Sequence, residues 1–283
     1  MRHFVLTMSC PDACGIISAV SGFLADHGGW IDEASYHSDP STQWFFMRQA
    51  IRADSLDFDP EDFSALFSPI ADRFSIKWRI WDTGRKKRVV VLASREDHCV
   101  NELVHRASTG DGPFEIVSIL SNHENLRSFV EWNRIPFHHV PVDPKAPHEH
   151  FSEIGRLFSE YRGDVMVLAR YMRILPESIC QEFSGRILNI HHSFLPSFAG
   201  ARPYHQAFLR GVKLIGATCH YVTAELDAGP IIEQDVIRID HGDSPEEMAR
   251  LGRDIEKLVL ARGLRYHAED RVLVHDNRTI VFH

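Results

Sequence analysis

The first 81 residues alternate between short strand patterns and helix patterns. Apolar and polar residues alternate from Arg2 to Ser9, which predicts a strand with one buried face. The polar segment "CPDACG" ends this strand, and the apolar residues that follow recur at helical spacing until Gly28. Two strands, a helix and a last strand are predicted next, at Trp30–His37, Gln43–Ile51, Pro60–Asp72 and Ser75–Trp81. The order βαββαβ is typical of a ferredoxin-like domain.

The apolar pattern changes after the polar segment "DTGRKKR" at 82–88. Three nearly continuous apolar runs follow, separated by segments of helix length, at Arg88–Ser94, Phe114–Asn122 and Gly163–Arg170. Such runs are typical of strands covered on both faces of a parallel sheet. Further strands are predicted in 186–192 and within 214–239. We therefore expect an α/β chain in which a small domain, 1–84, precedes a doubly wound, mostly parallel-sheet domain, 85–283.

The composition favours a small-molecule partner. The 283 residues carry a formal net charge of −8, so no broad positive field attracts nucleic acid or an anionic membrane, and the basic stretch at 82–88 is interpreted as a solvated hinge. The five cysteines form no CxxC pair, which indicates reduced thiols and a cytoplasmic protein. The sequence contains neither a signal-peptide pattern nor an apolar run of about 18 residues that could span a membrane.

Two polar residues end one of the predicted strands, in "RILNIHHSFLPSF". Asn189 could simply cap the strand, with the two histidines in a solvated loop. However, doubly wound sheets bind ligands beyond the carboxyl ends of their strands, and alternation points Asn189 and His191 the same way. His192 is then expected to point away and to be structural. An asparagine amide and a protonated histidine can together stabilise negative charge on a carbonyl oxygen.

Such a pair still needs a base, and the loop "VTAELDAGPII" offers Glu225 and Asp227. Either carboxylate could take a proton from an attacking water, so the residues suggest acyl-type transfer or hydrolysis. A catalytic metal is the rival chemistry, with candidate ligands His191, His192, His220 and Asp227. No HExxH-like spacing supports it, and His148 and His150 lie in a polar connector. We expect no metal.

At these residues the chain resembles a known family. Asn189–Asp235 is similar to the catalytic core of the formyltransferases that use 10-formyltetrahydrofolate, and Val167–Leu175 to their folate-binding strand and loop. The whole chain, small domain included, resembles the formyltetrahydrofolate deformylases. This resemblance implies hydrolysis of 10-formyltetrahydrofolate to formate and tetrahydrofolate, in one-carbon and purine metabolism. It also implies a catalytic trio of Asn189, His191 and Asp227, with the folate as substrate and no cofactor.

The resemblance further implies that backbone groups of two segments hold the pterin. The folate-binding residues are then expected to be Met172, Arg173, Leu175, Thr223, Ala224 and Glu225. An apolar wall with a few backbone donors and acceptors suits a flat heteroaromatic ring. The side chains of Met172 and Leu175 could equally be ordinary core residues.

One loop separates hydrolysis from transfer. Glycinamide ribonucleotide formyltransferases carry a glycine- and serine-rich loop after the first strand, whose amides bind the substrate phosphate. Here the loop is "ASREDHC", Ala93–Cys99, which has no glycine and contains Glu96 and Asp97, so it favours water over a phosphorylated amine. Ala228, in "LDAGP", is a minor departure from the deformylases. Two alternatives stay open, a formyltransferase for an unphosphorylated amine and a catalytically silent folate or amino-acid sensor.

Residues 1–84 resemble an ACT domain, a module that commonly binds amino acids where copies of it meet. The likeness lies in "CPDACGIISAVSGFLADHGGWI". It implies that Asp12 and Gly15, at the turn into the first helix, could bind an amino-acid effector such as glycine or methionine. The alternative is a dimerisation platform without a ligand. Either interpretation predicts a homo-oligomer, a homotetramer or a homodimer.

Overall fold

The computed structural model describes residues 1–58, 60–110, 112–143, 147–196 and 203–283. The chain forms two compact units, one of residues 1–86 and 269–283 and the other of residues 87–268. The predicted break after residue 84 lies close to the first junction. The predicted 85–283 domain differs from this division at its end, because the last residues pack with the N-terminal unit.

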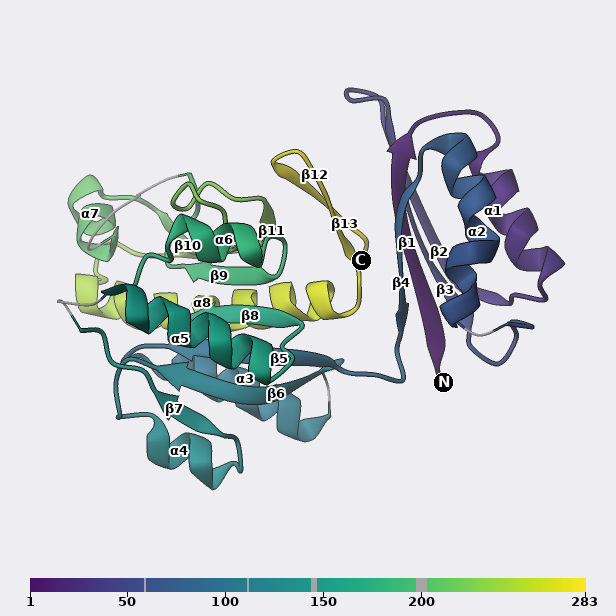
Figure 1. The fold of residues 1–283 in the computed structure, drawn as a ribbon. Coiled ribbons are helices and arrows are strands. Elements are labelled where there is room, and N and C mark those ends of the chain that lie inside the picture. The colour runs from purple at the N-terminus through teal and green to yellow at the C-terminus, as the bar shows by residue number, and fades with distance from the viewer. Residues whose placement is uncertain (59, 111, 144–146, 197–202) are drawn as a thin grey trace. The chain divides into compact units, whose positions relative to one another are not determined.

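The N-terminal unit has the predicted βαββαβ order. Its elements are β1 (His3–Pro11), α1 (Ile16–Asp26), β2 (Ile31–Asp39), β3 (Trp44–Arg52), α2 (Pro60–Phe74) and β4 (Lys77–Asp82). The strands form an antiparallel sheet in the order β2-β3-β1-β4, which confirms the ferredoxin-like arrangement. Both helices pack on one face of this sheet (Figure 1), where Leu6, Met47 and Phe67 belong to one buried cluster.

The C-terminal hairpin contributes to the same unit. It consists of β12 (Val272–His275) and β13 (Arg278–Val281). Phe46 of β3 is fully buried in a cluster with Leu273 and Phe282. The buried Arg48 lies 3.0 Å from Glu33 and donates to the carbonyl oxygen of Glu269. The hairpin therefore belongs to the small unit through apolar contacts, and Glu269, shortly before it, through the hydrogen bond from Arg48.

The C-terminal unit alternates strands and helices. Its elements are β5 (Lys87–Ala93), α3 (His98–Thr109), β6 (Phe114–Ser121), α4 (Arg127–Trp132), β7 (Phe137–His139), α5 (Pro147–Glu160), β8 (Val165–Ala169), α6 (Glu177–Glu182), β9 (Ile187–His191), α7 (Pro203–Arg210), β10 (Leu214–Tyr221), β11 (Ile231–Arg238) and α8 (Pro245–Ala268). The sheet order is β11-β10-β9-β8-β5-β6-β7. Among the strand pairs described for this sheet, only β9–β10 and β10–β11 are antiparallel, so the predicted mostly parallel sheet is confirmed.

The chain reverses its direction across this sheet between β5 and β8. It first proceeds outward from β5 to β7, then returns to β8 on the other side of β5. Helices α5 and α6 cover one face of the sheet, and α3 and α8 cover the other (Figure 1). The carboxyl ends of β8 and its neighbour β9 therefore lie at the edge where such sheets bind ligands.

Candidate functional site

The site forms where β9 ends beside β10. Asn189 and His191 both line a cavity of about 570 Å³, as their alternation predicts. The other walls come from the segment that follows β8 and from the loop between β10 and β11. The antiparallel register places His220 opposite Asn189 and Thr218 opposite His191.

Asn189 is oriented by His220. The two side-chain nitrogens Nδ2 and Nε2 lie 3.1 Å apart, and Nδ1 of His220 lies 2.8 Å from the carbonyl oxygen of Tyr221. A carbonyl oxygen can only accept a hydrogen bond, so Nδ1 of His220 carries the ring hydrogen. Nε2 of His220 therefore accepts a hydrogen bond from the amide of Asn189. Burial lowers the pKa of His220, which keeps the ring neutral and suited to this role. One amide hydrogen of Asn189 remains for a ligand.

His191 pairs with the predicted base. Its Nδ1 lies 3.3 Å from Oδ2 of Asp227. The hydrogen bond with His191 lowers the pKa of Asp227 against the opposing effect of burial, so the carboxyl group is ionised near neutrality. The other ring nitrogen of His191, Nε2, is buried and has no hydrogen-bond partner. Buried polar atoms are nearly always paired, so this nitrogen indicates a position for a ligand.

The backbone around Asp227 is strained. Asp227 has φ 55°, a left-handed conformation that costs energy for a residue with a side chain. Gly229 follows in close contact with β10, because a Cβ there would lie 1.9 Å from the carbonyl oxygen of Tyr221. Only glycine allows this approach. The "DAGP" sequence thus holds the carboxylate of Asp227 against His191.

All six predicted folate-binding residues line the same cavity. They are Met172, Arg173, Leu175, Thr223, Ala224 and Glu225. Leu175 is 8% exposed and belongs to the core, whereas Met172 is 59% exposed. The backbone amide of Met172 donates to Ser94 of the neighbouring β5 segment. The segment after β8 is thus anchored at Met172, whose side chain stays exposed.

His192 differs from the expectation that it points away. Its ring also lines the cavity and stacks on His191 with centroids 5.1 Å apart. Strand β9 ends at His191, so the alternation that holds within a strand no longer applies to the next residue. Burial lowers the pKa of His192 to about 4, so this ring is neutral near pH 7.

A second cluster of ionisable groups lies beside the site, and sequence reasoning missed it. Glu256 of α8 bonds to His98 at 2.8 Å and to Tyr204 at 2.7 Å, and Nε of Arg170 lies 3.4 Å away. Within the described residues, His98, Cys99 and Glu256 are the one group that could hold a metal ion. The guanidinium of Arg170 already neutralises that carboxylate, which suits a cation poorly. The metal ligands considered from the sequence, His191, His192, His220 and Asp227, do not form such a group among the described residues.

The remaining sequence candidates lie elsewhere. Glu96 and Asp97 are exposed, and His98 from the same loop points to Glu256. In the N-terminal unit, Gly15 has φ 93° at the start of α1, and exposed Asp12 accepts a hydrogen bond from Ser38. His150 is buried and bonded to Tyr171.

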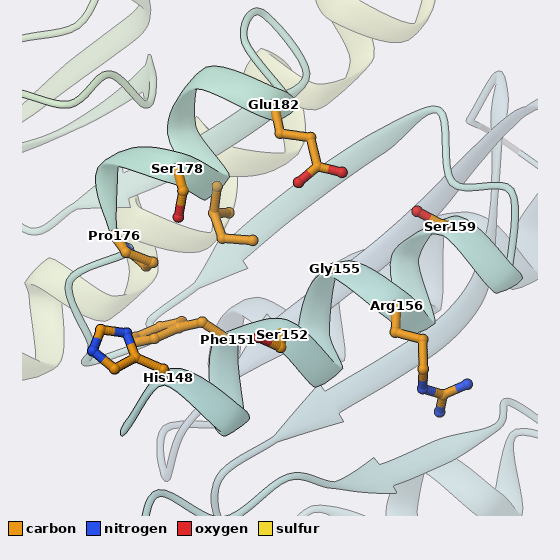
Figure 2. A pocket seen from close by; sticks show the side chains of 10 residues that line it. His148, Phe151, Ser152, Gly155, Arg156, Ser159, Pro176, Ser178 and Glu182 are labelled. Atoms are coloured by element: carbon orange, nitrogen blue, oxygen red, sulfur yellow. The ribbon is translucent and has the colours of Figure 1, made fainter. Parts of the chain in front are cut away.

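A second hollow of about 360 Å³ lies between α5 and α6 (Figure 2). It is lined by His148, Ser152 and Ser178 among others. Its cation, Arg156, is already paired with Glu153 and Glu160. The β9 cavity, in contrast, brings together Asn189, Asp227 and a buried, unpartnered nitrogen of His191. Among the described helices, none is both long and apolar enough to cross a membrane.

Similarity to known proteins agrees with this geometry. Residues 87–264 match the family described as formyl transferase. A Bacillus subtilis formyltetrahydrofolate deformylase is 46% identical over 278 residues, which cover 98% of this chain and 93% of that protein. The solved structure of a formyltetrahydrofolate deformylase from Pseudomonas syringae pv. tomato has a TM-score of 0.98 and 61% identity, covering 100% of this chain and 95% of that one.

Transferases of the same fold are similar over a smaller part of the chain. The structure of glycinamide ribonucleotide transformylase 1 from Symbiobacterium toebii has a TM-score of 0.67 and 27% identity. The match covers 72% of this chain and 98% of that chain. The likeness to deformylases, in contrast, extends over both units.

Proposed function

Given that this chain belongs to the formyl transferase family and, within it, to the formyltetrahydrofolate deformylases, we propose that Asn189, His191 and Asp227 carry out its reaction. The reaction is the hydrolysis of 10-formyltetrahydrofolate to formate and tetrahydrofolate. The observation that supports this assignment best is the unpartnered, buried Nε2 of His191, which lies in the same cavity as the Asn189 amide.

The first step is activation of the formyl group. Its carbonyl oxygen accepts hydrogen bonds from the free amide hydrogen of Asn189 and from protonated Nε2 of His191. As water attacks the formyl carbon, negative charge grows on this oxygen, and fixed donors in a partly dry cavity stabilise it far better than bulk water does. Asp227 holds the His191 ring in place and stabilises its positive charge.

The second step transfers protons. The attacking water forms a new C–O bond and loses a proton toward Asp227, which is ionised and therefore able to accept it. The tetrahedral intermediate then collapses with cleavage of the C–N10 bond. A proton returns to N10, and formate and tetrahydrofolate leave. These steps require neither a metal nor a redox cofactor.

The pterin is proposed to bind between the two segments predicted for it. The exposed Met172 and Arg173 and the loop 223–225 line the cavity next to the trio. Their backbone groups can satisfy the polar edge of the ring while the apolar side chains cover its faces.

The proposal is tested with purified protein and 10-formyltetrahydrofolate, with and without glycinamide and with and without a chelator. We expect formate and tetrahydrofolate in equal amounts in all four reactions. Formate release that requires glycinamide would favour a transferase, and loss of release on chelation would require a metal. Absence of formate release in every reaction would favour the alternative of a catalytically silent sensor.

The N-terminal unit is proposed to act as an oligomerisation platform that also binds an amino acid near Asp12 and Gly15. The support is the ferredoxin-like topology and the positive φ of Gly15 at the start of α1. All five cysteines are free thiols, which supports the proposed cytoplasmic location. Sedimentation of the intact protein would distinguish a homodimer or homotetramer from a monomer.

A further inference from the structure

Glu256 is an unusual residue of the C-terminal unit. It is 1% exposed, and among the described residues it is the only carboxylate among the buried charged side chains. Burial raises the pKa of Glu256, but the hydrogen bond from His98, the charge of Arg170 and the hydrogen bond from Tyr204 outweigh this effect and lower it to about 2. The carboxylate is therefore ionised inside the protein.

Such a network is a poor source of stability. Removing charges from water costs several kcal/mol per ion, roughly what their mutual attraction returns, so well-packed apolar residues would stabilise the fold as well. Nδ1 of His98 and Nε of Arg170 are also buried without a hydrogen-bond partner. The network therefore calls for a functional explanation.

Two members of the network form part of the cavity wall. Arg170 and Tyr204 line the cavity together with His192, whose ring centroid lies 6.3 Å from that of Tyr204. Neither is free to move aside. The guanidinium of Arg170 is paired with Glu256, and the backbone of Arg170, directly after β8, has φ 59°. The hydroxyl of Tyr204 is held by Glu256, and it packs so closely on α8 that a Cβ at Gly252 would lie 2.0 Å from it.

We propose that Glu256, through Arg170 and Tyr204, fixes the part of the cavity wall that lies beside the acceptor's path to the formyl group. The space left by this wall admits water to the formyl carbon and excludes an amine. This inference rests on the proposed function and names the residues that decide the acceptor. The mechanism is steric exclusion by the Tyr204 ring and the Arg170 side chain, both of which Glu256 holds.

Both reactions break the same C–N10 bond. In hydrolysis the oxygen of water forms the new bond to carbon, and formate leaves. In transfer the nitrogen of an amine forms it, loses one proton, and leaves as a formamide, while N10 gains a proton in either case. The activated formyl group is identical in the two reactions, so the wall alone selects the product.

The first test uses the unaltered protein and 10-formyltetrahydrofolate labelled with ¹³C in the formyl group. Hydroxylamine, close to water in size, and the larger glycinamide are added separately, and the products are quantified by NMR. We expect formohydroxamate from hydroxylamine and only formate with glycinamide. Formylglycinamide at a yield equal to that of formohydroxamate would overturn the inference. Absence of formate in all reactions would instead contradict the proposed function.

The second test removes part of the cavity wall by mutation. Tyr204→Ala removes the ring, and we expect the ratio of formylglycinamide to formate to rise at least about tenfold. Tyr204→Phe keeps the ring and removes only the hydroxyl that Glu256 holds, so its ratio of formylglycinamide to formate should lie between those of wild type and Tyr204→Ala. If Tyr204→Ala fails to fold, Arg170→Gly replaces it, since glycine accepts the positive φ at that position. A folded variant that hydrolyses the substrate but never formylates glycinamide contradicts the inference.

Discussion

Two carboxylates of the C-terminal unit stand beside histidines in opposite circumstances. Asp227 is partly exposed, sits in a strained turn and pairs with His191, whose second nitrogen has no partner. Glu256 is fully buried and is surrounded by His98, Tyr204 and Arg170. The first cluster is left incomplete on the side of the cavity, whereas both oxygens of the second carboxylate are occupied.

This difference distinguishes the proposed roles of the two clusters: the Asp227 cluster takes part in the reaction, and the Glu256 cluster fixes the cavity wall. Similar residue types serve both clusters, so residue identity alone does not assign a role. Nε2 of His191 is buried with neither a hydrogen bond nor an ion pair, which indicates a ligand, whereas Nε of Arg170 is ion-paired with Glu256. A fully paired carboxylate indicates a fixed surface.

The largest effect is expected at Asp227. Asp227→Asn keeps the volume and removes the charge, so turnover should fall about 10³-fold or more with a much smaller change in KM. Steady-state kinetics measure both quantities. Glu225→Gln, a change at an exposed residue of the same loop, is the matched control and should retain most activity. A variant at Asp227 that retains a tenth of wild-type turnover would place the base elsewhere, with Glu225 as the next candidate.

A smaller effect is expected at His220, which orients Asn189. His220→Phe removes the acceptor for the amide and should lower turnover about 10–100-fold, with little change in KM. A merely structural role would instead lower the melting temperature and leave the turnover of folded protein unchanged. That outcome would remove His220 from the site.

The strands, and the shared cavity of Asn189 and His191, could be predicted from the sequence because they depend on local patterns. The choice of Asp227 over Glu225 came from the family resemblance and stays a prediction. Asn189 and His191 share a face through simple alternation, and the strained "DAGP" turn is marked by its glycine. His220 required knowledge that β10 pairs antiparallel with β9. Its signal was present, since a histidine inside an apolar strand needs a polar partner.

Other features depend on contacts that no local pattern encodes. Glu256 lies in a polar stretch of a helix and resembles a surface residue in sequence. Its burial depends on His98 and Arg170, each contributed by a distant element. The hairpin at 272–281 has strand character, but it packs against the other end of the chain, where Phe46 shares a buried cluster with Leu273 and Phe282. Predicting it required the tertiary fold.

Acid should weaken the Glu256 network. The pKa of the folded carboxyl group is about 2, below its ordinary value of 4.5, so the network stabilises the fold above the ordinary value and loses this stabilisation as pH falls toward 2. Between about pH 7 and about pH 3, the free energy of unfolding should fall about 2 kcal/mol more in wild type than in Glu256→Gln. Urea titrations at both pH values measure it. Equal losses would mean that Glu256 is not the buried anion described.

The smallest effect is expected in the N-terminal unit. Glycine or methionine should change the deformylase rate of the intact protein about a few-fold, and Asp12→Asn should abolish that response without changing the basal rate. A deletion of residues 1–84 is unsuitable, because it would leave the C-terminal hairpin without the sheet that buries Phe282. If no amino acid changes the rate, or the variant responds like wild type, the platform has no effector role.

The most direct test of the central claim is a single turnover on bound substrate. Protein in excess over 10-formyltetrahydrofolate is mixed without amine and with a chelator, and folate binding and formate are followed in the same sample. We predict one formate per substrate from wild type, and from the Asn189→Ala, Asp227→Asn double variant bound folate without formate. Formate formed at the wild-type rate by that double variant would contradict the claim that these residues carry out the hydrolysis.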